Sequence, residues 1–100
     1  MKIYLAGPIN SSGSLIKNIN HFNKVAKALR VQGHEVYNPV EFNDVNREYS
    51  AYIRRAINIL YDCDFDTLML IGDWHTSKGV SIETMIADIL GIKIERYEEW

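Results

Sequence analysis

The chain contains a single cysteine, no apolar run approaching the length of a membrane-spanning helix, and no basic cluster larger than the pair Arg54-Arg55. One cysteine, Cys63, cannot form an internal disulfide, and no Cys/His spacing resembles a zinc site, so we expect no metal. A net charge of −2 argues against a protein that binds nucleic-acid backbone. The opening segment, residues 1–8, is too short for a signal peptide. We therefore expect neither a membrane nor a nucleic-acid partner, and a cytoplasmic location.

The composition is that of an ordinary globular protein, with 47% hydrophobic and 24% charged residues among 100. A chain of this length can enclose one hydrophobic core, and no linker, repeat or low-complexity tract divides it. We therefore expect one domain spanning residues 1–100.

Strand-like apolar runs alternate with helical apolar patterns along the chain. Strands are predicted at residues 2–6, 34–37, 66–71 and 92–95, and helices at residues 15–31, 49–61 and 77–90. Ser14 or Ser12 is a candidate N-cap for the first helix, which Gly33 would end. This alternation predicts a parallel sheet with helices on both faces. Ligands of such sheets bind beyond the carboxyl ends of the strands, here the loops at 7–14, 38–49 and 72–77.

The segment Ser77-Lys78-Gly79-Val80-Ser81-Ile82-Glu83 stands between a predicted strand and a predicted helix. A serine and a glycine at a helix N-terminus offer a hydroxyl, unblocked N–H groups and the positive end of the helix dipole, which suit a phosphate. Glu83 follows within two turns and would face whatever the anion is attached to. The same residues are also compatible with an ordinary N-cap and a solvated helix carboxylate.

Three segments together resemble a known family: Lys2-Ile3-Tyr4-Leu5-Ala6-Gly7-Pro8-Ile9, Gly33-His34-Glu35-Val36-Tyr37-Asn38-Pro39, and the stretch from Ser77 to Glu83. They are similar to the nucleoside 2-deoxyribosyltransferase superfamily, within it the small, often phage-borne branch, over residues 2–94. The resemblance implies a flavodoxin-like or Rossmann-like three-layer α/β sandwich and a homodimer or higher oligomer with its site near a subunit interface. It also implies cleavage or transfer at the N-glycosidic bond of a nucleoside or its 5′-monophosphate, without metal or other cofactor.

The resemblance assigns roles residue by residue. Glu83 matches the nucleophile, and Tyr4 matches a tyrosine at the end of the first strand that lines the sugar site. The expected substrate-binding residues come from two loops: Gly7, Pro8, Ile9 and Asn10 in the first, and Ser77 and Gly79 on the phosphate side. From its size and loop position, Trp74 is a candidate wall of the base pocket, although it could equally cover the edge of the core.

The second helix departs from the family pattern. Family members usually carry an aspartate near its end, and the corresponding position here is Ala56, with Asn58 the nearest polar residue. One of the acids in residues 62–66 could replace this aspartate if the alignment of the segment with the family pattern is shifted. The first hypothesis is therefore an N-glycosidase or deoxyribosyltransferase, and the alternative is a nucleotide-binding protein that sequesters its ligand without turnover. A small interaction domain without a ligand is a third possibility.

Overall fold

The computed structural model describes residues 1–9, 14–42 and 49–98, without the side chains of Tyr49 and Thr76. Asn10 and Ser12, which the sequence singled out, lie outside these residues. The elements are, in chain order, β1 (Lys2–Ala6), α1 (Leu15–Val31), β2 (Glu35–Tyr37), a 3-10 helix (Pro39–Glu41), α2 (Tyr49–Asp62), β3 (Thr67–Leu70), a second 3-10 helix (Trp74–Thr76), α3 (Lys78–Ile89) and β4 (Lys93–Arg96).

The four strands of the described chain form one parallel sheet in the order β2-β1-β3-β4. Tyr4 in the middle of β1 pairs with Tyr37 of β2 on one side and with Leu68 of β3 on the other. This confirms the predicted α/β class, and the order agrees with a flavodoxin-like or Rossmann-like sandwich.

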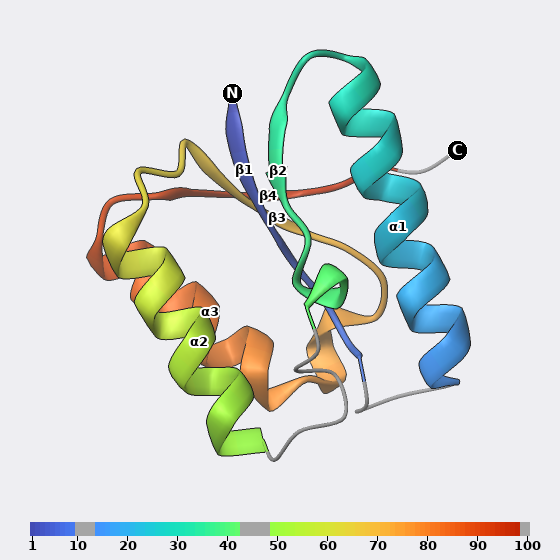
Figure 1. The fold of residues 1–100 in the computed structure, drawn as a ribbon. Helices are drawn as coiled ribbons and strands as arrows, with labels where there is room; N and C mark the ends of the chain where they lie inside the picture. The colour runs from blue at the N-terminus through green and yellow to red at the C-terminus, as the bar shows by residue number, and fades with distance from the viewer. Residues whose placement is uncertain (10–13, 43–48, 99–100) are drawn as a thin grey trace.

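The sheet separates two layers of helix: α1 covers one face, while α2 and α3 lie side by side over the other (Figure 1). Alternation along β1 sends Ile3 and Leu5 into the core under α1, and Tyr4 and Ala6 into the core under α2 and α3. Tyr4 is therefore placed on the face that α3 covers.

Local capping signals set the limits of α1. The hydroxyl of Ser14 accepts a hydrogen bond from the Lys17 N–H at 3.4 Å, so the predicted N-cap is confirmed for Ser14. Gly33 follows the helix with φ of 94°, a backbone conformation that glycine adopts without a side-chain clash.

The observed boundaries differ from the predicted ones mostly at element ends. His34 lies outside β2, and its N–H donates to the Leu29 carbonyl at the end of α1. Asp66 lies outside β3, and its carboxylate accepts the Lys2 N–H at 2.7 Å at the amino end of the sheet. The loops predicted at 38–49 and 72–77 both contain a 3-10 turn, Pro39–Glu41 and Trp74–Thr76. Asn38 caps the first of these by accepting from the Val40 N–H.

Candidate active site

Glu83 lies on the inner side of α3, directly against the sheet. Its side chain is only 1% exposed, and its Oε2 accepts a hydrogen bond from the phenol of Tyr4 in β1. The other oxygen, Oε1, is buried and has no hydrogen-bond partner among the described residues. The two residues that the resemblance assigned to catalysis are thus in direct contact, although 79 positions separate them in the sequence.

Burial raises the pKa of Glu83 to about 8, and the hydrogen bond from Tyr4 opposes that shift by favouring the charged form. Burial, with the adjacent Glu83 carboxyl as a further cause, also raises the pKa of Tyr4 well above its ordinary value. The pair is therefore largely uncharged at neutral pH, with both protons retained. A carboxyl group in this state must lose its proton before it can act as a nucleophile.

An aromatic stack continues outward from Tyr4. Its ring lies parallel to that of Tyr37 with centroids 5.0 Å apart, and Tyr37 stacks in turn on Phe42 at 5.3 Å. Phe65 meets Tyr4 edge to face at 5.4 Å. Burial raises the pKa of Tyr37 to about 12, while the neighbouring Arg55 guanidinium lowers it in part. These rings hold the Tyr4 phenol in one orientation toward Glu83.

Sequence reasoning did not identify Tyr37 or Phe65 as neighbours of the site. The sequence placed Tyr4 and Tyr37 in two separate predicted strands but gave no information on how those strands pair. Only knowledge that β1 and β2 pair with these residues opposite each other would have revealed the stack.

The N-terminus of α3 has the geometry that its sequence predicted. The Ser77 hydroxyl accepts from the Val80 N–H at 3.2 Å, so Ser77 is the N-cap. Gly79 is buried against α2, where an added Cβ would lie 3.6 Å from the Tyr52 ring and 3.5 Å from Ile53. Capping by Ser77 is thus observed, and the first N–H groups of α3 have no partner within the helix.

Gly7 of the first loop has a structural role, and its predicted contact with a substrate stays a prediction. An added Cβ at Gly7 would lie 2.7 Å from the Ile71 carbonyl oxygen, so this glycine allows two stretches of backbone to approach each other. The positive-φ glycines of the described chain are Gly33, Gly72 and Gly91, so the need for glycine at position 7 comes from this close approach. Pro8 is buried, and Ile9 packs into the core under α1 while its carbonyl accepts from Asn18.

The structure brings Trp74 to the α2/α3 side of the sheet, the side that also holds Glu83. Its ring packs against the core that contains Tyr4, and its centroid lies 3.7 Å from that of His75. The indole Nε1 is buried and finds no acceptor among the described residues. Trp74 therefore has an unused hydrogen-bond donor and Glu83 an unused hydrogen-bond acceptor. Both lie on the side of the sheet that α2 and α3 cover.

Ala56 leaves the site without a second carboxylate from α2. It is 3% exposed and belongs to the core cluster that holds Tyr4, whereas Asn58 is exposed. Asp62 and Asp64 are exposed as well, and the Asp66 carboxylate is occupied at the amino edge of the sheet. The structure gives no sign that an acid of this run compensates for Ala56.

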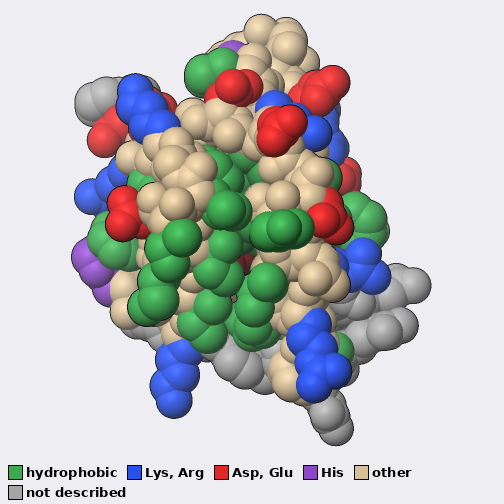
Figure 2. Space-filling model, turned by 90° about the vertical axis from the view of Figure 1, so that its left-hand side faces the viewer, with side chains coloured by type: hydrophobic (Ala, Val, Ile, Leu, Met, Phe, Trp, Pro, Cys, Tyr) green, Lys and Arg blue, Asp and Glu red, His purple; other side chains and the backbone are tan. Residues whose placement is uncertain are grey.

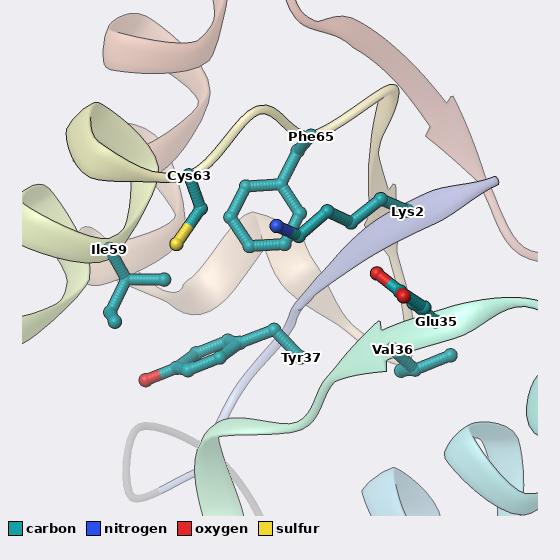
Figure 3. A pocket seen from close by; sticks show the side chains of 7 residues that line it. All are labelled: Lys2, Glu35, Val36, Tyr37, Ile59, Cys63 and Phe65. Atoms are coloured by element: carbon teal, nitrogen blue, oxygen red, sulfur yellow. The ribbon is translucent and has the colours of Figure 1, made fainter.

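A hollow of about 220 Å³ opens on the α2 side of the sheet at the amino ends of β1 and β2 (Figure 3). The rings of Tyr37 and Phe65 form two of its walls, Ile59 and Cys63 contribute from the α2 side, and the Lys2 ammonium lies 5.4 Å from the Phe65 ring centroid. None of the predicted substrate-binding residues line it. Tyr37 belongs to both the hollow and the candidate site, because its ring borders the hollow and also stacks on Tyr4.

Among the described residues, no group of three or more His, Cys, Asp or Glu side chains is arranged to hold a metal ion. No helix in the same residues is long and apolar enough to cross a membrane.

Comparison with known proteins places the chain in a family without assigning it an activity. No curated protein sequence matches the chain. A family model described as a domain of unknown function, DUF4406, matches residues 1–96. The chain therefore belongs to the DUF4406 family.

Proposed function

We propose that this protein cleaves or transfers at the N-glycosidic bond of a nucleoside or its 5′-monophosphate, with Glu83 as the nucleophile. The observation that carries the proposal is the buried Tyr4–Glu83 pair, in which one carboxyl oxygen is held by a phenol and the other is left without a partner. The resemblance of three sequence segments to nucleoside 2-deoxyribosyltransferases supports the same chemistry.

In the proposed reaction, ionised Glu83 attacks the anomeric carbon through Oε1, while the Tyr4 phenol continues to donate to Oε2. The bond between the sugar carbon and the base nitrogen breaks, and the base leaves with the electron pair and takes up a proton from water. The resulting glycosyl ester is then attacked at the anomeric carbon by water or by a second base, which releases the carboxylate.

Two features of the site shape this mechanism. Glu83 is almost fully buried, so a substrate must separate the side chains that cover it before the sugar reaches Oε1. Its raised pKa means that the nucleophilic form becomes abundant only as the pH approaches about 8. We therefore expect the rate to rise with pH through the neutral range.

The 5′-phosphate of a monophosphate substrate would bind at the N-terminus of α3, where Ser77 and Gly79 begin the helix that carries Glu83. The helix dipole and free N–H groups there favour an anion. The first loop, where the resemblance assigns Gly7, Pro8, Ile9 and Asn10 to substrate binding, would border the sugar, and Trp74 the base. Nucleotides and nucleosides of a cytoplasm, including that of a phage-infected cell, are the expected substrate pool.

A second candidate function is nucleotide sequestration without turnover. Ala56 favours it, because the buried position where a supporting carboxylate is expected holds a methyl group. Such a protein would retain the pocket and bind the same ligands.

A turnover assay separates the two functions. The purified protein would be incubated with ribo- and deoxyribonucleosides and their 5′-monophosphates, and free base measured by chromatography. Glu83→Gln would remove the nucleophile, and Asp64→Asn would change an exposed carboxylate as the matched control. We expect base release that persists in Asp64→Asn and is lost in Glu83→Gln.

Two other outcomes would contradict the proposed enzymatic activity. Thermal stabilisation by a nucleotide without base release would establish the binding protein instead. Neither release nor stabilisation with any ligand of the panel would contradict both functions.

A further inference from the structure

We propose that the hollow at the amino ends of β1 and β2 is a second ligand site, which binds a neutral flat heterocycle carrying a hydrogen-bond acceptor next to an N–H donor. Lactam rings are compounds of this class. The inference does not depend on the proposed function, because the hollow is lined by residues other than those assigned to the substrate.

The hollow lies where the helices leave the edge of the sheet uncovered. β2 is an edge strand, and its first residue, Glu35, is paired with Lys2 of β1 and is exposed. Lys2 and Glu35 each precede by two positions a tyrosine on the α2/α3 face, so their side chains point to that face as well. Ile59 and Cys63, at the C-terminal end of α2, border the hollow from the other side (Figure 3).

Contacts away from the hollow hold its aromatic walls in place. Tyr37 stacks on Tyr4 and on Phe42, and Phe65 meets Tyr4 edge to face. The two walls, Tyr37 and Phe65, stand at 70° to each other with ring centroids 6.3 Å apart. A ligand therefore meets a site that is already formed, and its binding orders few additional side chains.

The size of the hollow limits the ligand to one ring or a small fused pair. Its volume is about 220 Å³. An apolar cavity of about 150 Å³ is large enough to bind benzene, whereas pockets for drug-sized ligands begin at about 300 Å³. A substituted ring therefore fits the hollow, and a whole nucleotide is too large to be enclosed by it.

The charges around the hollow favour a neutral ligand over an ion. The Lys2 ammonium lies 5.4 Å from the centroid of the Phe65 ring, so a cation placed over that ring would meet a like charge. An anion would meet the Glu35 carboxylate and the negative end of the α2 dipole, because α2 ends at Asp62, beside the hollow. Figure 2 shows that the acidic side chains of the α2/α3 face lie in its upper half, toward which α2 runs.

The same two charged groups define the polar edge of the ligand. Figure 3 shows Lys2 and Glu35 entering the hollow from the strands, opposite Ile59 and Cys63. An ammonium group only donates hydrogen bonds, and an ionised carboxylate only accepts them. A ring with a carbonyl next to an N–H group offers an acceptor to Lys2 and a donor to Glu35, while its faces contact the apolar walls. A hydrocarbon ring would remove both charged groups from water without replacing their hydrogen bonds.

The test uses Cys63, the one cysteine of the chain, whose side chain lines the hollow. Alkylation of its thiol by iodoacetamide would be followed by mass spectrometry on the full chain with 2-pyridone, benzoate or benzylammonium, single-ring probes that are neutral, anionic and cationic. With about seven non-hydrogen atoms, 2-pyridone should bind with a Kd of about 1 mM. At ten times that concentration it should slow alkylation about elevenfold, and the two ions should slow it much less.

Substitutions at the polar edge should change the selectivity in opposite directions. Lys2→Met and Glu35→Gln should each weaken binding of 2-pyridone by about fivefold, since each removes one charge-assisted hydrogen bond at a partly exposed position. Lys2→Met should also improve binding of benzylammonium, and Glu35→Gln that of benzoate. The matched control is Lys24→Met, which removes an exposed lysine of α1 and should bind all three probes as the wild type does.

An NMR titration of each folded protein would give every Kd independently of the thiol, and circular dichroism would verify that each variant is folded. Absence of 2-pyridone binding at about ten millimolar would overturn the site. Equal binding of all three probes, or selectivity that Lys2→Met and Glu35→Gln leave unchanged, would overturn the ligand chemistry. Ile59→Phe places a ring in the hollow and should abolish binding, so undiminished binding to this variant would show that 2-pyridone binds elsewhere.

Discussion

Replacing Glu83 by glutamine should change how the stability of the protein depends on pH. Glutamine has nearly the same shape as the protonated carboxyl group and keeps an oxygen that can accept from the Tyr4 phenol, but it cannot ionise. The substitution therefore isolates the effect of one buried titrating group.

The direction of the effect follows from the pKa of Glu83, which burial raises from an ordinary 4.5 to about 8. Between these values the unfolded chain has lost the proton, while the folded protein retains it. The wild-type free energy of unfolding should therefore be highest below about pH 4.5 and decrease as the pH rises toward 8. In this window each pH unit lowers the free energy of unfolding by about 1.4 kcal/mol.

From about pH 5.5 to about pH 7.5, the free energy of unfolding of the wild type should fall by about 2.5 kcal/mol more than that of Glu83→Gln. Denaturant unfolding of both proteins across this range, followed by circular dichroism, measures the difference. Contributions from histidines and exposed groups are common to both proteins and cancel. Glu41, whose pKa its ion pair with Arg30 lowers, titrates below the window.

Parallel pH profiles for the two proteins would refute the reasoning, since they would mean that Glu83 titrates as an ordinary exposed carboxyl. Asp64→Asn, which alters an exposed acid, serves as the control and should follow the wild type. A decline that is equally steep in the wild type and in Asp64→Asn, and steeper in both than in Glu83→Gln, would confirm that the carboxyl is buried with its proton retained at neutral pH.

Substitutions at three further residues test the site and the fold around it. Tyr4→Phe should raise the pKa of Glu83 further and reduce stability by about 1.5 kcal/mol, because Oε2 loses its donor; a stability profile that does not move to higher pH would contradict this. Gly7→Ala should cost about 1–3 kcal/mol, since its Cβ would meet the Ile71 carbonyl at 2.7 Å, and an unchanged denaturation midpoint would disprove the close approach. Ser14→Ala should lower the stability by about 1 kcal/mol through loss of the α1 cap, whereas Ser14→Asp should retain it.

The secondary structure was largely predictable because its signals are local. The apolar spacing from Leu15 to Val31, the cap at Ser14 and the short apolar run of β1 each depend on neighbours in the sequence. Errors fell at ends such as His34 and Asp66, where a long-range hydrogen bond or the limit of sheet pairing decides the boundary.

The site was predictable only in part. Glu83 and Tyr4 were identified through the resemblance, and Ser77 through its capping signal, but their burial and contact depend on which strand lies under α3. Tyr37 and Phe65 were missed, since their approach to Tyr4 requires the pairing of β1 with β2 and the path of the chain into β3. Trp74 was named for its size, and its unpaired Nε1 could not be foreseen.

By itself, the sequence determined the alternation of strands and helices, the absence of a second acid at Ala56 and the residues available for chemistry, because composition and periodicity are properties of the chain. The tertiary structure alone decided that the Glu83 carboxyl is removed from water and held by a phenol 79 positions away. It also decided that exposed apolar residues of α2 and α3 gather on one face of the molecule (Figure 2). Both outcomes depend on desolvation and on distances between residues remote in sequence, which are fixed only when the strands pair and the helices pack.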